Sequence, residues 1–256
     1  MTRATISIVS HGHGALLEHL LRDLSAQQDI DQCTIVLTLN LADEPFEPSM
    51  HLGLTLTVLR NQAPKGFGAN HNAAFCHCIA PLFLILNPDI RLADSQAIAR
   101  LVDAQAPIGL RAPRITNLAG KPEDSVRRNL TPWSLMRRLA GLDREPVAQI
   151  IAHRGLPFIW FAGMFLVVDA DAFRHVNGFD ERLFLYCEDY DLCARLYNAG
   201  YELRVSEEVQ AIHDAQRDSH RKFHHLKWHI ASLVKVWTSA AFWRVVLSPI
   251  ASPKHP

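Results

Sequence analysis

The segment PLFLILN, at residues 81–87, is an uninterrupted apolar run that ends in a polar turn. A strand with one face in solvent alternates apolar and polar residues, whereas an uninterrupted run is typical of a strand covered on both faces. Sheets covered on both faces are mostly parallel, because helices connect their strands across each face. This segment therefore predicts an α/β fold in which residues 81–87 form a central strand.

The rest of the chain alternates between strand-like and helical segments. The other strand-like segments are ATISIV (4–9), CTIVLTL (33–39), LTLTVLR (54–60), PFIWFAGMFLVVD (157–169), YELRVS (201–206) and VQAIHD (209–214). Helical patterns lie at 16–24, 66–79, 94–104, 171–178 and 188–200. This alternation predicts a mostly parallel central sheet flanked by helices. Residues 111–130 resemble loops or a short hairpin, and 131–142 a short helix with Thr131 as N-cap and Pro132 at its first position.

Bulk composition excludes several classes of protein. Lys plus Arg and Asp plus Glu number 26 each, so no net field favours binding to nucleic acid. The five cysteines are an odd number without CxxC spacing, which indicates free thiols in a reducing compartment. The N-terminus lacks the pattern of a signal peptide, and no apolar stretch has the length of a membrane span. We therefore expect a cytoplasmic protein.

The turn after the central strand contains Asn87 and Asp89, in LILNPDI. In open α/β sheets, ligands bind beyond the carboxyl ends of the strands. A carboxylate fixed there suits a hard divalent cation that holds phosphate oxygens. An Asx-type turn with a solvated Asp89 explains the same residues, and the spacing leaves both interpretations open.

Two further segments suit ligand binding but have ordinary structural explanations as well. In RNQAPKGFGANHNAAF, Gly66 permits close backbone approach before a helix N-terminus and Lys65 can reach a phosphate. The segment is neither GxGxxG nor a P-loop, so a glycine turn before a packing helix is favoured on spacing alone. His213 ends a short strand in AIHDAQRDSH, where it is either a metal ligand or a hydrogen-bonded structural residue.

The segment LFLYCEDYDLCARL places three acids in apolar surroundings. Asp191 and Arg195 have i,i+4 spacing and are predicted to form an ion pair on the helix. Glu188 and Asp189 lie where a helix N-cap belongs, so one of them can cap the helix. Either can also act as a general base, but spacing alone favours capping.

Taken in order, these segments resemble family 2 glycosyltransferases of the GT-A fold, in particular the rhamnosyltransferase-like branch. The segments that carry the resemblance are SIVSHG, NQAPKGFGANHN, LILNPDI, WFAGMFLVVDADAFRHVNGFDERLFLYCEDYDLCARLYNAGYELR and IHDAQRDS. It extends from about residue 5 to about residue 240, and the GFDE…ED.DLC block is its most specific part. The resemblance implies one GT-A domain at 1–220, with a nucleotide-sugar half to about 110 and an acceptor half beyond it, followed by a helical tail at 221–256.

The resemblance also implies roles for individual residues. Asp89 would hold a divalent cation, Mg²⁺ or Mn²⁺, with His213 as a further ligand or diphosphate contact. Asp189 would be the general base that deprotonates the acceptor hydroxyl, with Glu188 orienting it, in one displacement that inverts the anomeric centre. The residues expected to contact the nucleotide sugar are Ser10, Asn40, Lys65, Gly66, Asn72 and Asn87.

The implied reaction moves a sugar, with rhamnose as the first candidate, from a nucleoside diphosphate sugar to a saccharide in cell-surface polysaccharide synthesis. The implied acceptor is lipid-linked. The chain departs from the family at Leu39, where an Asp that contacts the nucleotide base is usual; Asn40 and Asp43 remain. That departure motivates an alternative, a nucleotide-sugar-binding protein without catalysis. A sugar-1-phosphate nucleotidyltransferase is a second alternative, although SHGHGALLEHL lacks the basic residues that its phosphate loop needs.

The tail at 220–247 reads as one long amphipathic helical stretch. Its aromatic residues alternate with Lys and Arg, a pattern typical of helices that lie at a membrane surface. The residues in question are Trp228, Trp237, Phe242 and Trp243, with Lys227, Lys235 and Arg244. We therefore expect either peripheral contact with the inner membrane or packing of this helix on protein.

Overall fold

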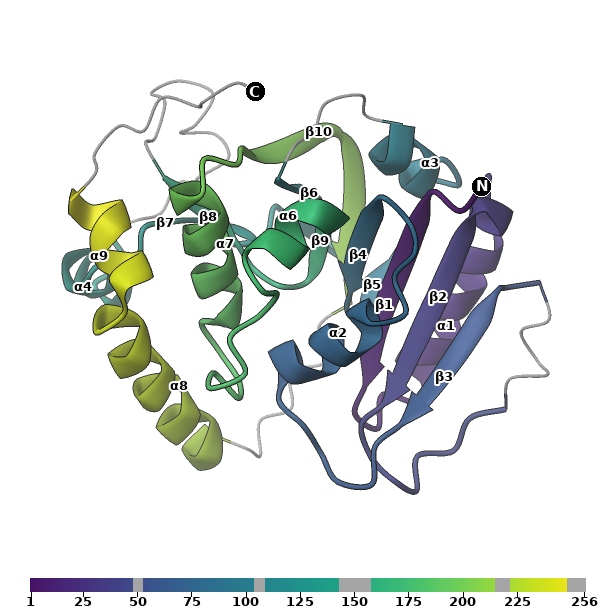
Figure 1. Cartoon of the computed structure of the whole chain (residues 1–256), viewed down its shortest axis with the longest axis horizontal. Helices are drawn as coiled ribbons and strands as arrows, with labels where there is room; N and C mark the ends of the chain where they lie inside the picture. The colour runs from purple at the N-terminus through teal and green to yellow at the C-terminus, as the bar shows by residue number, and fades with distance from the viewer. Residues whose placement is uncertain (48–52, 104–108, 143–157, 215–221, 248–256) are drawn as a thin grey trace.

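The computed structural model describes residues 1–47, 53–103, 109–142, 158–214 and 222–247 (Figure 1). An eight-stranded sheet with the order β3-β2-β1-β4-β9-β6-β10-β5 forms its framework. The strands are β1 (Ala4–Ser10), β2 (Cys33–Leu39), β3 (Leu56–Arg60), β4 (Leu82–Leu86), β5 (Ile90–Arg91), β6 (Leu110–Asn117), β9 (Phe165–Asp169) and β10 (Leu203–His213). Neighbours pair in parallel except where β9 joins β4 and β6 and where β5 joins β10. The predicted mostly parallel α/β sheet is confirmed.

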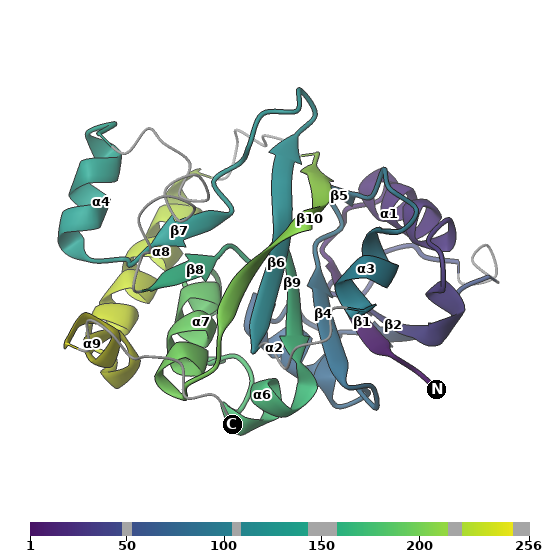
Figure 2. The same ribbon diagram turned by 90° about the horizontal axis from the view of Figure 1, so that it is seen from above.

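Helices cover both faces of this sheet (Figures 1 and 2). The helices are α1 (Ala15–Ser25), α2 (Phe67–Phe75), α3 (Ala97–Asp103), α4 (Pro132–Leu139), α6 (Ala170–His175), α7 (Glu188–Asn198), α8 (Lys222–Trp237) and α9 (Ala240–Leu247), with a 3-10 turn at Ile30–Gln32. Side chains of α1 and α3 share one apolar core, and those of α2, α6, α7 and α9 share the other. The two cores lie on opposite faces of the sheet.

Strand β4 shows why the sequence specifies this layering. Successive side chains of a strand point to opposite faces. Phe83 and Ile85 belong to the core that contains α2 and α7, whereas Leu84 and Leu86 belong to the core that contains α1 and α3. All four are fully buried. The prediction that 81–87 form a central strand covered on both faces is confirmed.

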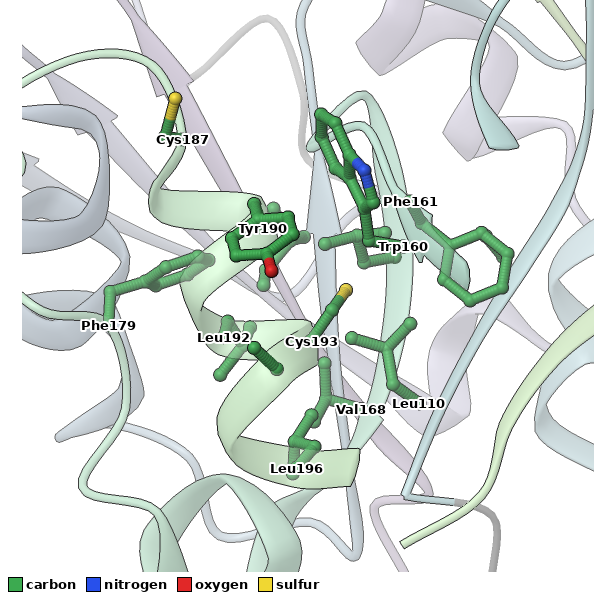
Figure 3. Close-up of a cluster of buried hydrophobic side chains, with 14 of the residues drawn as sticks. Leu110, Trp160, Phe161, Val168, Phe179, Cys187, Tyr190, Leu192, Cys193 and Leu196 are labelled. Atoms are coloured by element: carbon green, nitrogen blue, oxygen red, sulfur yellow. The ribbon is translucent and has the colours of Figure 1, made fainter. Parts of the chain in front are cut away.

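The larger core is built around α7 (Figure 3). Tyr190 packs edge-to-face against Trp160, and its hydroxyl donates to Asn129 Oδ1 at 2.7 Å. Cys193 lies on the same helix, fully buried and unbridged. Cys33 and Cys187 are also buried free thiols, as their spacing predicted. The apolar core therefore anchors helix α7, and the first turn of this helix carries its acids.

The segment 157–169 was predicted to be one strand, which is wrong. Residues Ile159–Phe161 form β8, which pairs with β7 (Val126–Arg128) in a separate two-stranded sheet. A tight turn at 162–164 follows, and β9 begins at Phe165. Gly163 allows the break, because a Cβ there would lie 3.1 Å from the ring of Phe67. An apolar run alone could not show that it serves two sheets.

The segments 111–130 and 201–214 also differ from prediction. Residues 110–117 form the long internal strand β6, because Arg111, whose charge suggested a loop, is buried and donates to Leu101 O at 2.5 Å. Residues 203–213 form one strand, β10, and not two short ones. Its pairing with β6 shifts register between Ser206 and Gln210, next to Pro113, which has no N–H to donate.

The C-terminal tail forms two helices and not one. Helix α8 ends at Trp237, α9 begins at Ala240, and their axes differ by 60°. Trp237 Nε1 donates to Leu130 O at 2.8 Å, and Phe242 is buried in the α7 core. These two aromatic side chains therefore pack on the domain, which is one of the two alternatives expected for the tail.

Among the described residues, no single helix is long and apolar enough to cross a membrane. The bent pair formed by Lys227–Trp237 and Ala240–Leu247 meets that criterion only when its two helices are taken together. Residues 143–157 of the predicted acceptor half, and 221 and 248–256 of the tail, lie outside the described residues.

Candidate active site

The carboxyl ends of β1, β2 and β4 meet at one edge of the sheet, where the candidate site lies. Ser10 ends β1, Asn40 follows β2, and Asn87 follows β4. The backbone N–H of Asn40 donates to Ser10 O at 2.8 Å, so the first two of these ends are joined directly. Parallel strands put their carboxyl ends at the same edge, and this is why residues far apart in sequence converge here.

The structure brings Asp89 and His213 together. The turn from Asn87 to Ile90 closes through a 3.2 Å hydrogen bond, and β5, which follows it, pairs with the end of β10. His213 Nε2 lies 3.1 Å from Asp89 Oδ2. The two predicted metal ligands are therefore neighbours, although 124 residues separate them in sequence.

Glu123 is a third member of this group that the sequence did not indicate. Its Oε2 lies 2.7 Å from His213 Nδ1, so the imidazole lies between two carboxylates. These hydrogen bonds, the one to Asp89 first and the one to Glu123 next, raise the pKa of His213 to about 9, against the lowering effect of burial. Glu123 follows a lysine-proline turn and has no spacing signal of its own, so only the fold connects it to His213.

The donor atoms at this place fit a divalent cation. Asp89 Oδ1 is buried and has no hydrogen-bond partner, so one carboxylate oxygen is left over for a ligand. Carboxylate oxygen and imidazole nitrogen together suit Mn²⁺ and similar ions. A carboxylate on the far nitrogen of a metal-binding histidine, as Glu123 is here, commonly orients that ring. Within the described ranges no cluster of three or more such side chains surrounds a common point, so Asp89 and His213 are the pair available.

A network of asparagine side chains fixes the loop that carries Lys65. Asn40 Oδ1 accepts from Lys65 N at 2.9 Å and from Asn61 Nδ2 at 2.8 Å, and its Nδ2 donates to Lys65 O at 3.0 Å. Asn61 Nδ2 also donates to Asn70 Oδ1 at 2.7 Å. The amide of Asn40 is therefore used internally, and its role is to position the loop. The side chain of Lys65 is exposed at the loop's surface.

Gly66 and Asn72 connect helix α2 to the GFDE segment. A Cβ on Gly66 would lie 2.6 Å from Phe184 O, so the close approach that glycine permits here is to the chain itself. Asn72 Nδ2 donates to Phe179 O, and its Oδ1 accepts from Phe179 N, both at 2.9 Å. These contacts link the first half of the chain to the loop that precedes α7. Direct contact of either residue with a nucleotide sugar stays a prediction.

A buried acid lies beside Ser10 at the end of β1. Ser10 Oγ donates to Glu44 Oε1, and Glu44 Oε2 is buried without a partner. Charges of Asp89 and Glu44 both act on His13, whose pKa is lowered overall because burial outweighs them. Glu44 therefore lies on the Asp89 side of the site. The sequence pointed to Asp43 instead, but Asp43 is exposed and Leu39 is fully buried in the core.

Glu188 and Asp189 occupy the first turn of α7, after an unusual stretch of backbone. The N-cap is Cys187, whose side chain makes no capping hydrogen bond, so neither acid occupies the capping position. Tyr186 and Cys187 have φ angles of 72° and 64°, in the left-handed region that side chains rarely adopt. Such residues typically cost about 1–3 kcal/mol each and cluster at functional sites. The two residues with positive φ set the direction in which α7 begins, and they thereby position the acid pair.

The two acids differ in how their charge is stabilised. Asp189 accepts from Gly163 N at 3.1 Å and from Tyr190 N at 2.8 Å, whereas Glu188 Oε2 is buried without a partner. Burial, and then the charge of Asp189, raises the pKa of Glu188 to about 8. Burial also raises the pKa of Asp189, but Arg127 and the two N–H donors oppose the shift. When the pair carries a single negative charge, Asp189 is therefore the ionised member.

The turn at 162–164 joins the two halves of the site. Its Met164 O accepts from Asn87 N at 2.9 Å, and its Gly163 N donates to Asp189. The Asn87 turn and the acid pair thus contact two adjacent residues of one three-residue turn. On the far side, Arg127 lies over the ring of Trp160 at 4.9 Å and brings its charge toward Asp189. Asp191 pairs with Arg195 at 2.7 Å, as predicted, and takes no part in this arrangement.

Comparisons with known proteins identify the family of this chain. The family model described as "Glycosyltransferase (GlcNAc)" matches residues 112–240, half of the chain. Rhamnosyltransferase WbbL of Escherichia coli K12 is 28% identical over 239 residues, 89% of each chain. The N-acetylglucosaminyl-diphospho-decaprenol L-rhamnosyltransferase of Mycobacterium tuberculosis is 44% identical over 81 residues, 29% of this chain and 26% of that protein.

A solved structure shows the same fold. The mannosyltransferase PcManGT of Pyrobaculum calidifontis, determined with GDP-Man and Mn²⁺, superposes with a TM-score of 0.62 at 15% identity, over 96% of this chain and 68% of that one. At this identity the likeness concerns the fold, which is GT-A. With the family model and the relatives above, it leads to one conclusion: the chain belongs to the glycosyltransferases, as a rhamnosyltransferase-like member of family 2 with the GT-A fold.

Proposed function

We propose that this glycosyltransferase moves a sugar, with rhamnose as the first candidate, from a nucleoside diphosphate sugar to a hydroxyl of a lipid-linked saccharide, with inversion. The arrangement that carries the proposal is the single turn at 162–164, which holds the Asp189 carboxylate on one side and the Asn87–Asp89 turn on the other. It supports a site with a base and a diphosphate-binding group at fixed separation. The names of the two rhamnosyltransferases support the sugar, and that of the mycobacterial protein supports a lipid-linked acceptor.

In the proposed step, Asp189 accepts the proton of the acceptor hydroxyl while that oxygen attacks the anomeric carbon. The bond from the anomeric carbon to the phosphate oxygen breaks, and its electron pair leaves with the nucleoside diphosphate. Because attack and departure occur on opposite faces, the configuration inverts. The hydrogen bonds of Asp189 support this role, since they favour its ionised form while Glu188 holds a proton.

Asp89 and His213 would hold a divalent cation, with Glu123 orienting the imidazole. Such an ion, when bound, offsets the charge that develops on the departing diphosphate. The unpartnered Oδ1 of Asp89 supports this assignment. Lys65, exposed on the loop that the asparagine network fixes, would add a positive charge near the phosphates.

Glu44 would take over the contact with the nucleotide base that Leu39 cannot make. Leu39 is fully buried in the core, whereas Glu44 holds one carboxylate oxygen without a partner beside Ser10. A single acceptor of this kind suits the ring N–H of uracil or thymine. Cytosine and adenine present an unprotonated ring nitrogen at the corresponding position and would be disfavoured.

The deciding experiment measures release of nucleoside diphosphate and formation of glycoside, with Mn²⁺ or Mg²⁺, a panel of nucleotide sugars and lipid-linked saccharide acceptors. We expect Asp189→Asn to lower the rate by about a hundredfold or more, because general-base catalysis contributes about that much. The variant should bind the nucleotide as the wild type does. Asp171→Asn changes an exposed acid far from the site and serves as the matched control. Chelation of the metal should abolish release in the wild type.

Two outcomes would contradict the proposal in different ways. Full activity of Asp189→Asn would remove Asp189 as the base. Tight nucleotide binding by the wild type with no turnover on any acceptor would favour the non-catalytic alternative, which a calorimetric titration alongside the rate assay would reveal.

A further inference from the structure

Helix α4 presents an apolar stripe to solvent. Trp133, Met136 and Leu139 follow one another at three-residue spacing and are 65%, 57% and 79% exposed. A surface helix of a globular protein normally turns such a stripe toward the core. Leu135 packs partly buried against the core, but no residue of α4 is fully buried, and the other three apolar side chains lie outward.

The opposite side of α4 is attached to the domain by polar contacts. Thr131 Oγ1 accepts from Ser134 N at 3.1 Å, which confirms the predicted N-cap. Ser134 Oγ donates to Asn129 O at 2.6 Å, and Arg138 pairs with Asp124. Since these contacts lie on the inward side, the orientation of the helix is specified and not accidental. These polar contacts therefore hold the exposed apolar stripe in a defined orientation.

Helices α8 and α9 lie at the same end of the molecule as α4 (Figures 1 and 2). The bond from Trp237 Nε1 to Leu130 O joins the end of α8 to the start of α4. On α9, Trp243 and Leu247 are 50% and 73% exposed, although Phe242 and Val245 of the same helix are buried. We call the exposed residues Trp133, Met136, Leu139, Trp243 and Leu247 the apolar end surface.

The helices that carry or adjoin the apolar end surface have basic residues and no acidic ones, although Asp124 beside α4 pairs with Arg138. The chain as a whole is neutral, with 26 basic and 26 acidic residues. Helices α4, α8 and α9 contain no Asp or Glu, and their basic residues include Arg137, Arg138, Lys235 and Arg244. Apolar side chains bordered by Lys and Arg are the composition of helices that bind anionic bilayers.

We propose that the apolar end surface docks on an anionic lipid bilayer, with Trp133, Met136 and Leu139 of α4 as its central contacts. The inference rests on the proposed function only in that a lipid-linked acceptor gives the docking a purpose. It goes beyond the tail, because its central helix, α4, belongs to the proposed acceptor half of the chain.

The docking surface is coupled to the acid pair through α8. Ser232 Oγ donates to Leu185 O at 3.0 Å, and the ring of His229 stacks on Tyr186 at 4.9 Å. Both contacts are to the strained stretch that precedes Glu188. An acceptor whose lipid lies in the bilayer would therefore meet the catalytic helix from the side on which the enzyme rests.

The test is flotation with vesicles of phosphatidylcholine, with and without phosphatidylglycerol, at low and high salt and without nucleotide sugar. We expect the wild type to float only with the anionic vesicles and to be released by salt. The double variant Trp133→Gln/Leu139→Gln should partition about tenfold less, because burial of apolar area in the interface is lost. A second variant, Trp243→Gln/Leu247→Gln, tests the same surface from another helix.

The matched control is Ile79→Gln/Leu118→Gln, which removes two exposed apolar side chains elsewhere, 82% and 70% exposed. It should float like the wild type. The inference is overturned if the wild type stays at the bottom, if the control loses binding as much as the α4 variant, or if light scattering shows a dimer that the α4 variant dissociates. Nucleotide release on a soluble acceptor is measured in parallel, so that failure to float is separable from failure of the proposed reaction.

Discussion

At the scale of single residues, Glu188 and Asp189 show how two equal carboxylates acquire different tasks. They are adjacent and indistinguishable by spacing, with Glu188 buried and Asp189 half-buried. The backbone N–H groups of Gly163 and Tyr190 reach only Asp189, so the charge is stabilised there and the proton stays on its neighbour. The sequence could identify the pair, but one of the two hydrogen bonds that distinguish its members comes from Gly163, 26 residues away in the chain.

A first prediction concerns Glu44. We expect Glu44→Gln to raise the Kd for uridine or thymidine diphosphate about tenfold or more, since a hydrogen bond to a charged acceptor is worth about 1.5–3 kcal/mol. Asp43→Asn, which changes the exposed neighbour, should leave the Kd unchanged. Calorimetric titration of the three proteins gives the comparison. Equal affinities for wild type and Glu44→Gln would remove Glu44 from base recognition.

A second prediction concerns the pH dependence of stability. His71 is fully buried, its Nδ1 lies 2.8 Å from Ser7 Oγ, and burial lowers the pKa of His71 to about 3. An unfolded chain binds a proton at this position below about pH 6.5, but the folded protein does not. The free energy of unfolding should therefore fall by up to about 1.4 kcal/mol per pH unit as the pH drops from 6.5 toward 3.

Urea unfolding at about pH 7 and about pH 5 measures this effect. His71→Gln should lose less stability between the two pH values than the wild type, because the substituted side chain does not titrate. The control His77→Gln changes an exposed histidine of the same helix region and should keep the wild-type dependence. A wild-type slope in the His71 variant would mean that other groups cause the loss.

At the scale of elements, the contact between α2 and the segment before α7 is too close to accommodate an added methyl group. We predict that Gly66→Ala destabilises the protein by about 1–3 kcal/mol, the usual cost of forcing an extra methyl into a packed site. The new Cβ would lie 2.6 Å from the carbonyl oxygen of Phe184, which is backbone and cannot rotate away. Gly53→Ala, where a Cβ meets nothing within 4 Å, is the control. Equal urea midpoints for both variants would contradict the prediction.

Elements with a strong local pattern followed from the sequence, and those shaped by distant contacts did not. Strand β4 and the N-cap of α4 were predictable because an apolar run and a Thr-Pro pair act locally. Strand β6 was missed, because its arginines became acceptable only where Arg111 met the carbonyl of Leu101. The separation of β8 from β9 was missed because both are apolar and only the close ring of Phe67 requires the turn between them.

At the scale of the whole molecule, the C-terminal helices are part of the fold and not an appendage. Phe242 is buried within the α7 core, whereas Trp243 beside it is half exposed. We predict that Phe242→Ala lowers the free energy of unfolding by about 3–5 kcal/mol, the usual cost of removing a buried aromatic side chain. Trp243→Ala should cost less than half as much. Similar losses in urea unfolding would show that α9 does not pack as described.

The candidate site was predictable only as far as motifs extend. Asp89, His213 and Asp189 follow from the resemblance, and the structure places Asp89 beside His213 and Asp189 across a turn from them. Glu44 and Glu123 carry no motif, because each is defined by its contact with Ser10 or His213 across the sheet edge. Only the folded structure therefore shows that these two residues belong to the site.

The turn at 162–164 has a consequence for how such enzymes diversify. It is tied to the Asn87 turn and to Asp189, and it adjoins β8, whose partner β7 leads into α4. Substitutions in β7 and α4 can therefore change which acceptor is presented without altering the distance over which the sugar moves. Related enzymes can therefore differ in their acceptor and keep the same reaction, because the spacing between the Asn87 turn and Asp189 depends on only three residues.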